Sequence, residues 1–253
     1  MRVHVVQLSY GDDETLGARV DRVVEMVRAQ HGADLVVLPE LWPDGGFAYD
    51  GWEAAAQPLD GPVVNTLRDA TRELGALVHM GSLVERDETG RLFNTSVLLG
   101  RDGEVLATYR KIHLFGFGEG EPKLMTPGDD VVVHDGLGLA TCYDLRFPEQ
   151  FRRLLDAGAE VVLIPAAWPA KRVAHWRLLA QARAVENQSF VVACNTAGVH
   201  SGVAMGGGSI VVDPWGTVLA EAGTDQEVLV VDLDLDVVAR TRSSFPILAD
   251  RRL

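Results

Sequence analysis

Three residues with reactive side chains stand at or near the ends of apolar segments: Glu40 in VVLPE, Lys111 in TYRKIHLF and Cys142 in ATCYDLR. A thiol reacts as its thiolate and needs a base, and a carboxylate can take the thiol proton and later return it to a leaving amine. A lysine ammonium can hold the negative oxygen of a tetrahedral intermediate. Each residue taken alone also has a structural explanation. Glu40 could lie at the start of a helix, Lys111 at a solvated strand end and Cys142 in the core. Together, each near the end of an apolar strand, they favour a nucleophilic cysteine with a base and an oxyanion donor over three unrelated structural roles.

The segment around Cys142 has features that would suit a reactive cysteine, although a lone cysteine is by itself weak evidence. Residues 137–142 are predicted to form a short buried strand, and Phe147, Pro148 and Glu149 the first turn of a helix, with proline where its missing N–H costs nothing. Free backbone N–H groups after the cysteine and a nearby helix N-terminus both favour a thiolate and an adjacent oxyanion. The alternative is a small buried hydrophobic residue.

Composition excludes several classes of protein. The net charge is −13 and the isoelectric point about 4.9, whereas nucleic-acid binding needs a basic surface. Two cysteines, Cys142 and Cys194, lack the spacing of a redox pair and indicate a reducing compartment. No signal peptide is visible, and no apolar run approaches the roughly 20 residues of a membrane span. We expect a soluble, cytoplasmic protein that binds neither nucleic acid nor membrane.

The order of elements predicts an α/β fold. Strand and helix signals alternate from the start, which favours two mixed sheets flanked by helices within one domain. Asp-Gly turns at residues 102–103 and 135–136 predict two hairpins. The segment 242–253 has little periodicity and is expected to pack over a surface or a partner subunit. The predicted strands span residues 3–8, 33–38, 76–84, 92–99, 105–111, 131–134, 137–142, 161–164, 190–194, 209–212, 217–220 and 228–231, and the helices residues 16–29, 62–74, 151–157 and 173–186.

The chain also resembles the nitrilase superfamily of carbon–nitrogen hydrolases, most closely its Nit and ω-amidase branch. The resemblance covers almost the whole chain and rests on separate motifs in the expected order. These are HVVQLS, LVVLPELW, YRKIHLF, CYDLRFPE, HWRLLAQARAVENQSFVVACN and GGGSIVVDPWGTVLAEAG.

The resemblance implies one carbon–nitrogen hydrolase domain over residues 1–253, folded as a four-layer αββα sandwich and paired as a homodimer. It implies Cys142 as nucleophile, Glu40 as general base and acid, and Lys111 as oxyanion stabiliser, helped by the backbone N–H of Tyr143. The reaction would pass through a thioester, with no metal and no organic cofactor.

Many family members carry a second glutamate after the lysine, which positions substrate and lysine. The loop here offers Glu119 and Glu121, and EPKLMTPGD matches the family spacing from Glu121. The alternative for Glu121 is a solvated loop carboxylate. Glu186 in ARAVENQ also matches a family motif, but its helical setting indicates a structural role.

The substrate is expected to be a small amide with a carboxylate. Arg146, four residues after the cysteine, could hold that carboxylate bidentately, or form a surface salt bridge. Trp168 could form an apolar wall or pack in the core, and Arg172 could add charge near the site or lie on a helix surface.

The motifs favour an ω-amidase that releases ammonia from dicarboxylic acid monoamides such as α-keto acid amides. The sequence GGG stands before Ser209, where many relatives carry a His or an Asn. This departure bears on the fine substrate specificity and not on the three catalytic residues. The main alternative is an N-carbamoyl amino acid amidohydrolase, and a true nitrilase is less favoured. A non-catalytic binding or scaffold member is the alternative from another class, and a thiol-redox protein is weakly supported.

Overall fold

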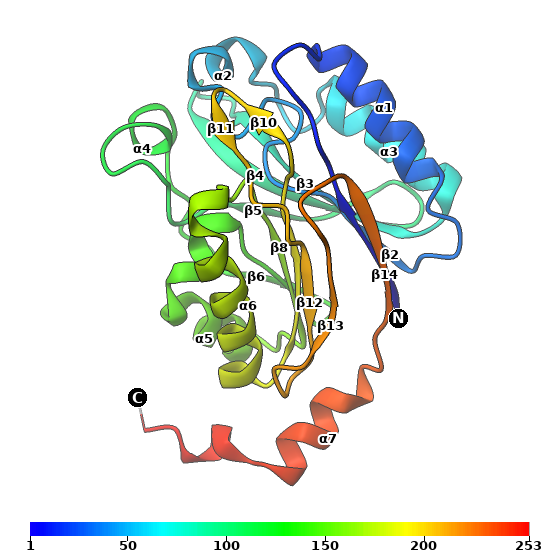
Figure 1. The fold of residues 1–253 in the computed structure, drawn as a ribbon, viewed down its shortest axis with the longest axis vertical. Coiled ribbons are helices and arrows are strands. Elements are labelled where there is room, and N and C mark those ends of the chain that lie inside the picture. Colours follow the sequence, from blue (N-terminus) through cyan, green and yellow to red (C-terminus); the bar gives the residue numbers. More distant parts are fainter. Residues whose placement is uncertain (253) are drawn as a thin grey trace.

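The strands form two mixed sheets, each with parallel strands at its centre and antiparallel strands at its edges (Figure 1). The computed structural model describes residues 1–252. Its first sheet has the order β14-β1-β2-β3-β4-β5, and its second the order β13-β12-β9-β8-β7-β6. The first comprises β1 (Arg2–Gln7), β2 (Leu35–Val37), β3 (Leu77–Arg86), β4 (Leu92–Leu99), β5 (Val105–Arg110) and β14 (Glu227–Asp232). The second comprises β6 (Val132–His134), β7 (Leu137–Leu139), β8 (Val161–Pro165), β9 (Phe190–Cys194), β12 (Ile210–Val212) and β13 (Val218–Glu221).

Helices cover the outer faces of both sheets. In Figure 1, α1 and α3 lie on one side and α5 and α6 on the other. A short hairpin, β10 (Val199–His200) and β11 (Val203–Ala204), stands apart from both sheets. The helices are α1 (Leu16–Arg28), α2 (Tyr49–Ala55), α3 (Pro62–Leu74), α4 (Glu121–Leu124), α5 (Pro148–Asp156), α6 (Val173–Asn187) and α7 (Asp236–Ser244), with 3-10 helices η1 (Cys142–Arg146), η2 (Ala170–Arg172) and η3 (Ile247–Asp250).

The alternation of side chains along the strands builds the layers. In β2, Leu35 and Val37 belong to the core between the two sheets, whereas Val36 packs in the core under α1 and α3. In β8, Leu163 faces the other sheet and Val162 faces α5 and α6. Strands buried on both faces are apolar at every position, because neither face meets water. The resulting four-layer αββα sandwich confirms the predicted fold class.

Gly81 allows strand β3 to pass close to the segment that carries Glu40. Gly81 lies at a register shift within β3 and has φ +70°. A Cβ atom there would lie 1.8 Å from the carbonyl oxygen of Pro39. Any other residue would therefore push β3 away from the segment that carries Glu40, in a conformation that side chains rarely adopt.

The structure corrects three local predictions. The strand expected over residues 137–142 ends at Leu139, and Cys142 instead begins the 3-10 helix η1 with φ +46°. Helix α2 (Tyr49–Ala55) is absent from the predicted helices. Helix α7 was not expected, because its sequence is largely polar, and it is held by contacts with distant elements rather than by an apolar periodicity.

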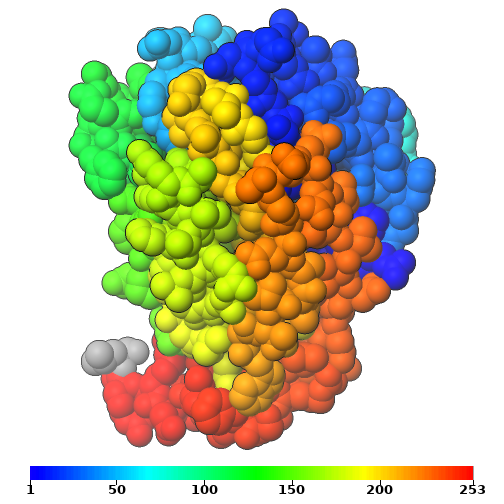
Figure 2. All heavy atoms as spheres, in the orientation of Figure 1, coloured from blue at the N-terminus to red at the C-terminus, as the bar shows by residue number. Residues whose placement is uncertain are grey.

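The C-terminal segment packs over the chain's own second sheet and helices (Figures 1 and 2). Arg242 donates to the carbonyl of Ala159 and to Ser189 Oγ, both at 3.0 Å, and Gln188 Nε2 donates to the carbonyl of Phe245 at 2.8 Å. In Figure 2 this segment, in red, lies across the end of the molecule below α6. These contacts agree with one of the two predicted alternatives, packing over a surface of the same chain, and residue 253 lies outside the described residues.

Within residues 1–252, no helix has both the length and the apolar character required to cross a membrane.

Candidate active site

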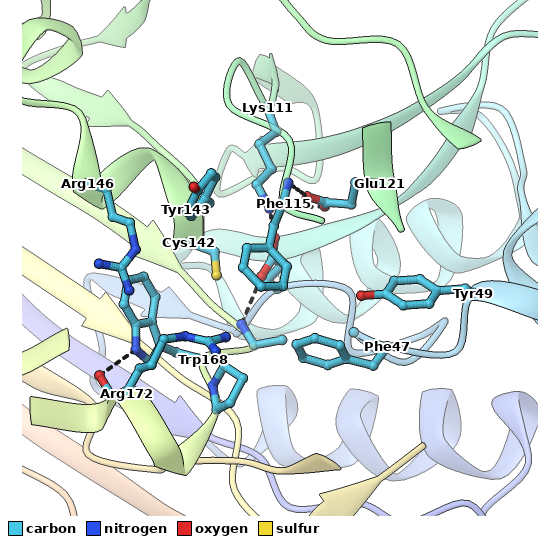
Figure 3. A pocket seen from close by; sticks show the side chains of 14 residues that line it. Phe47, Tyr49, Lys111, Phe115, Glu121, Cys142, Tyr143, Arg146, Trp168 and Arg172 are labelled. Atoms are coloured by element: carbon cyan, nitrogen blue, oxygen red, sulfur yellow. Dashed lines mark hydrogen bonds and ion pairs between the residues drawn. The ribbon is translucent and has the colours of Figure 1, made fainter. Parts of the chain in front are cut away.

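Glu40, Lys111 and Cys142 meet in one pocket at the carboxyl ends of strands from both sheets (Figure 3). Glu40 follows β2, Lys111 follows β5 directly and Cys142 lies three residues after β7. All three are buried, with 3%, 2% and 8% of their surfaces exposed. The sequence separates them by up to about a hundred residues, and the facing sheets bring them together. The pocket has about 390 Å³ of empty space, part of which is open to solvent.

A buried ion cluster links the lysine to two carboxylates. Lys111 Nζ donates to Glu40 Oε1 at 2.7 Å and to Glu121 Oε2 and Oε1 at 2.8 and 3.0 Å. Burial by itself would lower the pKa of Lys111, but Glu121 and Glu40 together raise this pKa well above its usual value. Burial raises the pKa of Glu121 against the opposing effect of Lys111. The ammonium is therefore charged at neutral pH.

The remaining oxygen of Glu40 is held by the second sheet. The backbone N–H of Ala167, which follows β8, donates to Glu40 Oε2 at 2.8 Å. Further along the chain, Leu41 N donates to Ser82 Oγ of β3 at 3.0 Å. Glu40 thus bridges the two sheets, and its carboxylate has little freedom to rotate.

The resting cysteine is a neutral thiol, which corrects the expectation of a thiolate-favouring environment. Burial raises the pKa of Cys142 well above its usual value, and the negative charge of Glu40 raises it further, against the opposing effect of Lys111. The helix start after Cys142 does not outweigh the loss of solvent. Proton removal must therefore accompany attack, with Glu40 beside the sulfur as the available base.

Asp144 ties the cysteine loop to the strand end that carries the lysine. Its Oδ2 accepts from Thr141 N at 2.8 Å and from the Tyr109 hydroxyl at 2.6 Å. Its Oδ1 lies 2.8 Å from His113 Nδ1 and accepts from His113 N at 3.0 Å. This fully buried carboxylate makes four contacts with three residues and so links the segment of Cys142 to the segment of Lys111.

Glu121, and not Glu119, is the second glutamate in the pocket. Besides its contacts with Lys111, Glu121 Oε2 accepts from Phe115 N at 2.6 Å. Glu119 is exposed and pairs with Lys123 at 3.0 Å. Glu186 lies away from the pocket and pairs with Arg183 at 2.7 Å, as expected for a structural residue.

Two guanidinium groups line the pocket without an acidic partner among residues 1–252. Arg146 lies with its guanidinium carbon 4.6 Å from the Trp168 ring centre and with both terminal nitrogens 3.4 Å from His175 Nδ1. The guanidinium carbon of Arg172 lies 5.2 Å from the Phe115 ring centre. Burial and the neighbouring charge of Arg172 lower the pKa of Arg146. Two unpaired cations in one small pocket give it a positive potential, which attracts anions.

Trp168 is both a wall of the pocket and part of the core. It lines the pocket and is 2% exposed, and its indole N–H donates to the carbonyl of Arg172 at 2.8 Å. The glycine segment that departs from the family pattern lies behind it, because Gly206 N donates to the Trp168 carbonyl at 2.8 Å. The glycines before Ser209 therefore belong to the segment that holds the backbone of Trp168 in place.

The structure adds residues that the sequence analysis did not assign. Three aromatic side chains also line the pocket: Phe47 and Phe115 from loops and Tyr49 from the first residue of α2 (Figure 3). The sequence shows that they are aromatic but not that they face the cysteine. Asn94 in β4 contacts both carboxylates of the ion cluster. A signal for it was present, since the polar run Asn94-Thr95-Ser96 interrupts an otherwise apolar strand. Among residues 1–252, no group of His, Cys, Asp and Glu is arranged to hold a metal ion.

Comparison with known proteins gives a consistent assignment. Residues 2–243 match the family model described as carbon-nitrogen hydrolase. The chain is 44% identical to a 2-oxoglutaramate amidase of Paenarthrobacter nicotinovorans, over 99% of this chain and 89% of that protein. It is 35% identical to the mouse omega-amidase NIT2, over 91% of this chain and 88% of that protein.

Solved structures give the same result. The crystal structure of Saccharomyces cerevisiae Nit3, a member of branch 10 of the nitrilase superfamily, superposes on this chain with a TM-score of 0.89 at 30% identity. The superposition covers 100% of this chain and 97% of that one.

Proposed function

Because this chain belongs to the carbon–nitrogen hydrolase family, we propose that it releases ammonia from the terminal amide of small dicarboxylic acid monoamides, the ω-amidase reaction. It is an amidase by that membership and by its similarity to 2-oxoglutaramate amidase and omega-amidase. The observation that carries the substrate proposal is the pair Arg146 and Arg172, which place two unpaired cations in the pocket that holds Cys142. A dicarboxylic monoamide offers an amide for the cysteine and a carboxylate for the arginines.

In the first half of the proposed reaction, Glu40 takes the proton of the Cys142 thiol as the sulfur attacks the amide carbon. The negative oxygen that forms lies between Lys111 Nζ and the backbone N–H of Tyr143. Tyr143 is the second residue of η1, so its N–H precedes the hydrogen bonds within that helix. Glu40 then gives its proton to the amide nitrogen, the C–N bond breaks, and ammonia leaves a thioester on Cys142.

In the second half, a water molecule replaces ammonia. Glu40 takes a proton from this water, whose oxygen attacks the thioester carbon, and the same two donors stabilise the second oxyanion. The C–S bond breaks and the proton on Glu40 returns to the sulfur. The products are a dicarboxylic acid and the resting neutral thiol, which agrees with the raised pKa of Cys142.

Ammonia release from four substrates tests the proposal. The panel contains 2-oxoglutaramate, a plain dicarboxylate monoamide, an N-carbamoyl amino acid and an aliphatic nitrile. We expect release from the two monoamides and none from the nitrile. Release from the carbamoyl compound alone would replace the ω-amidase with its main alternative, which also has a carboxylate for Arg146. No release from any of the four would contradict the substrate class.

Replacement of Arg146 by methionine is expected to lower kcat/KM for a dicarboxylic monoamide about 10- to 100-fold, the range for losing a charge-assisted hydrogen bond. The loss should appear mainly in KM, because the carboxylate is held equally in the ground state and the transition state. Steady-state kinetics on the monoamide and on a neutral aliphatic amide of similar length measure the effect. The neutral amide should be hydrolysed with nearly unchanged kcat/KM.

Arg177→Met is the matched control, because Arg177 is an exposed arginine of α6 that pairs with Glu221 outside the pocket. It should leave both substrates unaffected. The same pair of measurements on Arg172→Met shows whether the second guanidinium shares the anion. An equal loss on the neutral and the anionic amide would contradict a role of Arg146 in carboxylate binding.

The extent and location of the protein follow as proposals. The family match over residues 2–243 supports a single carbon–nitrogen hydrolase domain over residues 1–253. A cytoplasmic location is supported by the two buried free cysteines, Cys142 and Cys194.

We also propose a homodimer, formed through an apolar surface around α6. Leu178 and Val185 lie two turns apart on α6 and are exposed. Trp215 and Phe245, also exposed, stack on each other near the C-terminal end of α6. Sedimentation equilibrium should give twice the chain mass, and Leu178→Glu should give monomers because it places a charge in the interface. Val230→Glu, on the exposed side of β14, is the control and should remain dimeric. A monomeric unaltered protein would contradict the proposal.

A further inference from the structure

The side chain of Asn94, in β4, contacts both carboxylates of the active site. Its side-chain nitrogen donates to Glu40 Oε1 at 2.8 Å and to Glu121 Oε1 at 2.6 Å. The same two oxygens accept from Lys111 Nζ at 2.7 and 3.0 Å. Glu40, Lys111, Glu121 and Asn94 therefore form a closed ring in which two donors and two carboxylate oxygens alternate.

The geometry uses the whole donor capacity of the amide. An asparagine NH₂ group has two protons, and here one points to each carboxylate. The backbone of the same residue takes part as well, because its carbonyl accepts from Lys111 N at 2.8 Å. One residue of β4 thus sets the position of all three charged groups.

The side-chain oxygen of Asn94, in contrast to its nitrogen, makes no hydrogen bond within the described residues. Asn94 is 1% exposed, and its Oδ1 is buried without a hydrogen-bond partner among residues 1–252. A buried unpaired acceptor lowers stability, so an apolar residue of the same shape would suit the folded protein better at that end. Asn94 is also absent from the residues that line the pocket, so contact with substrate does not account for it.

We propose that Asn94 is a positioning residue that donates to the carboxylates of Glu40 and Glu121 and holds Glu40 at the cysteine. The assignment rests on the proposed amide hydrolysis for its catalytic meaning. Two buried carboxylates share a single ammonium, so the cluster carries one negative charge in excess. The two amide protons offset that excess, because a donor to the charged form of an acid favours that form.

The titratable groups around the carboxylates are few. Cys142, Tyr49 and Tyr10 face them from η1, α2 and the segment after β1, and all three are neutral in the resting site. Lys111 is the cation in contact. Removing the amide protons therefore leaves no other group that could replace their positive potential.

The alkylation of Cys142 by iodoacetamide tests the assignment without a natural substrate. Its rate is measured against pH for the unaltered protein and for Asn94→Leu. Because alkylation of the neutral thiol requires an ionised base, the acidic limb of the profile reports the carboxylate pair. We expect this limb to move to higher pH by about one unit in Asn94→Leu, and the plateau rate to fall about 10- to 100-fold.

Asn187→Leu is the matched control. Asn187 is also a buried asparagine with an unpaired Oδ1, but its NH₂ group donates to the carbonyl of Arg183 and not to a carboxylate. It should change the melting temperature and leave the pH profile in place. A purely structural role for Asn94 would give the same result in both variants, so an unmoved limb in Asn94→Leu would overturn the proposal.

Asn94→Asp keeps the size of the side chain and serves if Asn94→Leu does not fold. It replaces the donors by a third acid, so the limb should move further than in the leucine variant. An unchanged limb here would equally overturn the proposal. Failure of the proposed function would appear differently, as an unaltered protein that is alkylated with the expected profile but releases no ammonia from monoamides. For an amide that is hydrolysed, the Asn94 variants should lose kcat with little change in KM.

Discussion

Cys142→Ala is expected to lower kcat for any amide substrate by about 10⁴- to 10⁶-fold, as for other covalent nucleophiles. The sulfur forms the only covalent bond between the protein and the acyl group in the proposed reaction. Among the described residues that line the pocket, the Tyr49 and Tyr143 phenols are the only hydroxyl groups that could take its place. Burial raises the pKa of Tyr49, so its phenol stays neutral and is a poor nucleophile. The free energy of unfolding should change by no more than about 1 kcal/mol, because alanine keeps the Cβ atom and removes one atom at the pocket wall.

Cys194→Ala is the control for this result. Cys194 is buried in the core between the sheets, where its thiol donates to the carbonyl of Val6 at 3.3 Å. That variant should lose stability and keep its turnover, the reverse of Cys142→Ala. Measurements of ammonia release and of thermal unfolding on both proteins separate the two effects. Residual turnover near the unaltered rate in Cys142→Ala, with the same substrate, would remove Cys142 from the mechanism.

Lys111→Met is expected to damage both stability and catalysis. Methionine fills a similar volume but leaves Glu40 and Glu121 buried without their cation, which costs about 3–5 kcal/mol and lowers the melting temperature by about 10 °C. Turnover should fall at least about 10³-fold, because the oxyanion loses its charged donor. Lys123→Met, which removes the exposed partner of Glu119 on α4, should change neither quantity appreciably.

The stability of Lys111→Met should also depend on pH with a definite sign. Burial raises the pKa of Glu121 even beside Lys111, and without the lysine the lowering influence is gone. An acid with a higher pKa in the folded state than in the unfolded state binds more protons when folded, so its contribution is complete below the unfolded pKa and is lost as pH rises. Denaturant unfolding at pH 5 and pH 8 should show the variant closest to the unaltered protein at pH 5. If the two proteins differed by the same free energy of unfolding at pH 5 and at pH 8, the loss of Lys111 would not have raised the pKa of Glu121.

The sequence by itself determined the chemistry and the general architecture. Glu40, Lys111 and Cys142 are visible because each stands at or near the end of an apolar strand, and motifs in a fixed order carry the resemblance to a family. The strands and long helices followed from alternation and helical periodicity, since buried faces require apolar residues at regular intervals. Short elements were missed, because α2, α4 and α7 depend on contacts with distant segments.

Only the tertiary structure decided how the groups interact. The sequence gives Glu119 and Glu121 similar chemistry, and burial beside Lys111 distinguishes them. The protonation of Cys142 was predicted in the wrong direction, because desolvation and the charge of Glu40 depend on neighbours that come from other strands. Asn94 acquires its role only when β4 lies beneath both carboxylates. A pattern of residue types reports which groups are present, but their pKa values and contacts are set by distances that exist only after the two sheets have packed.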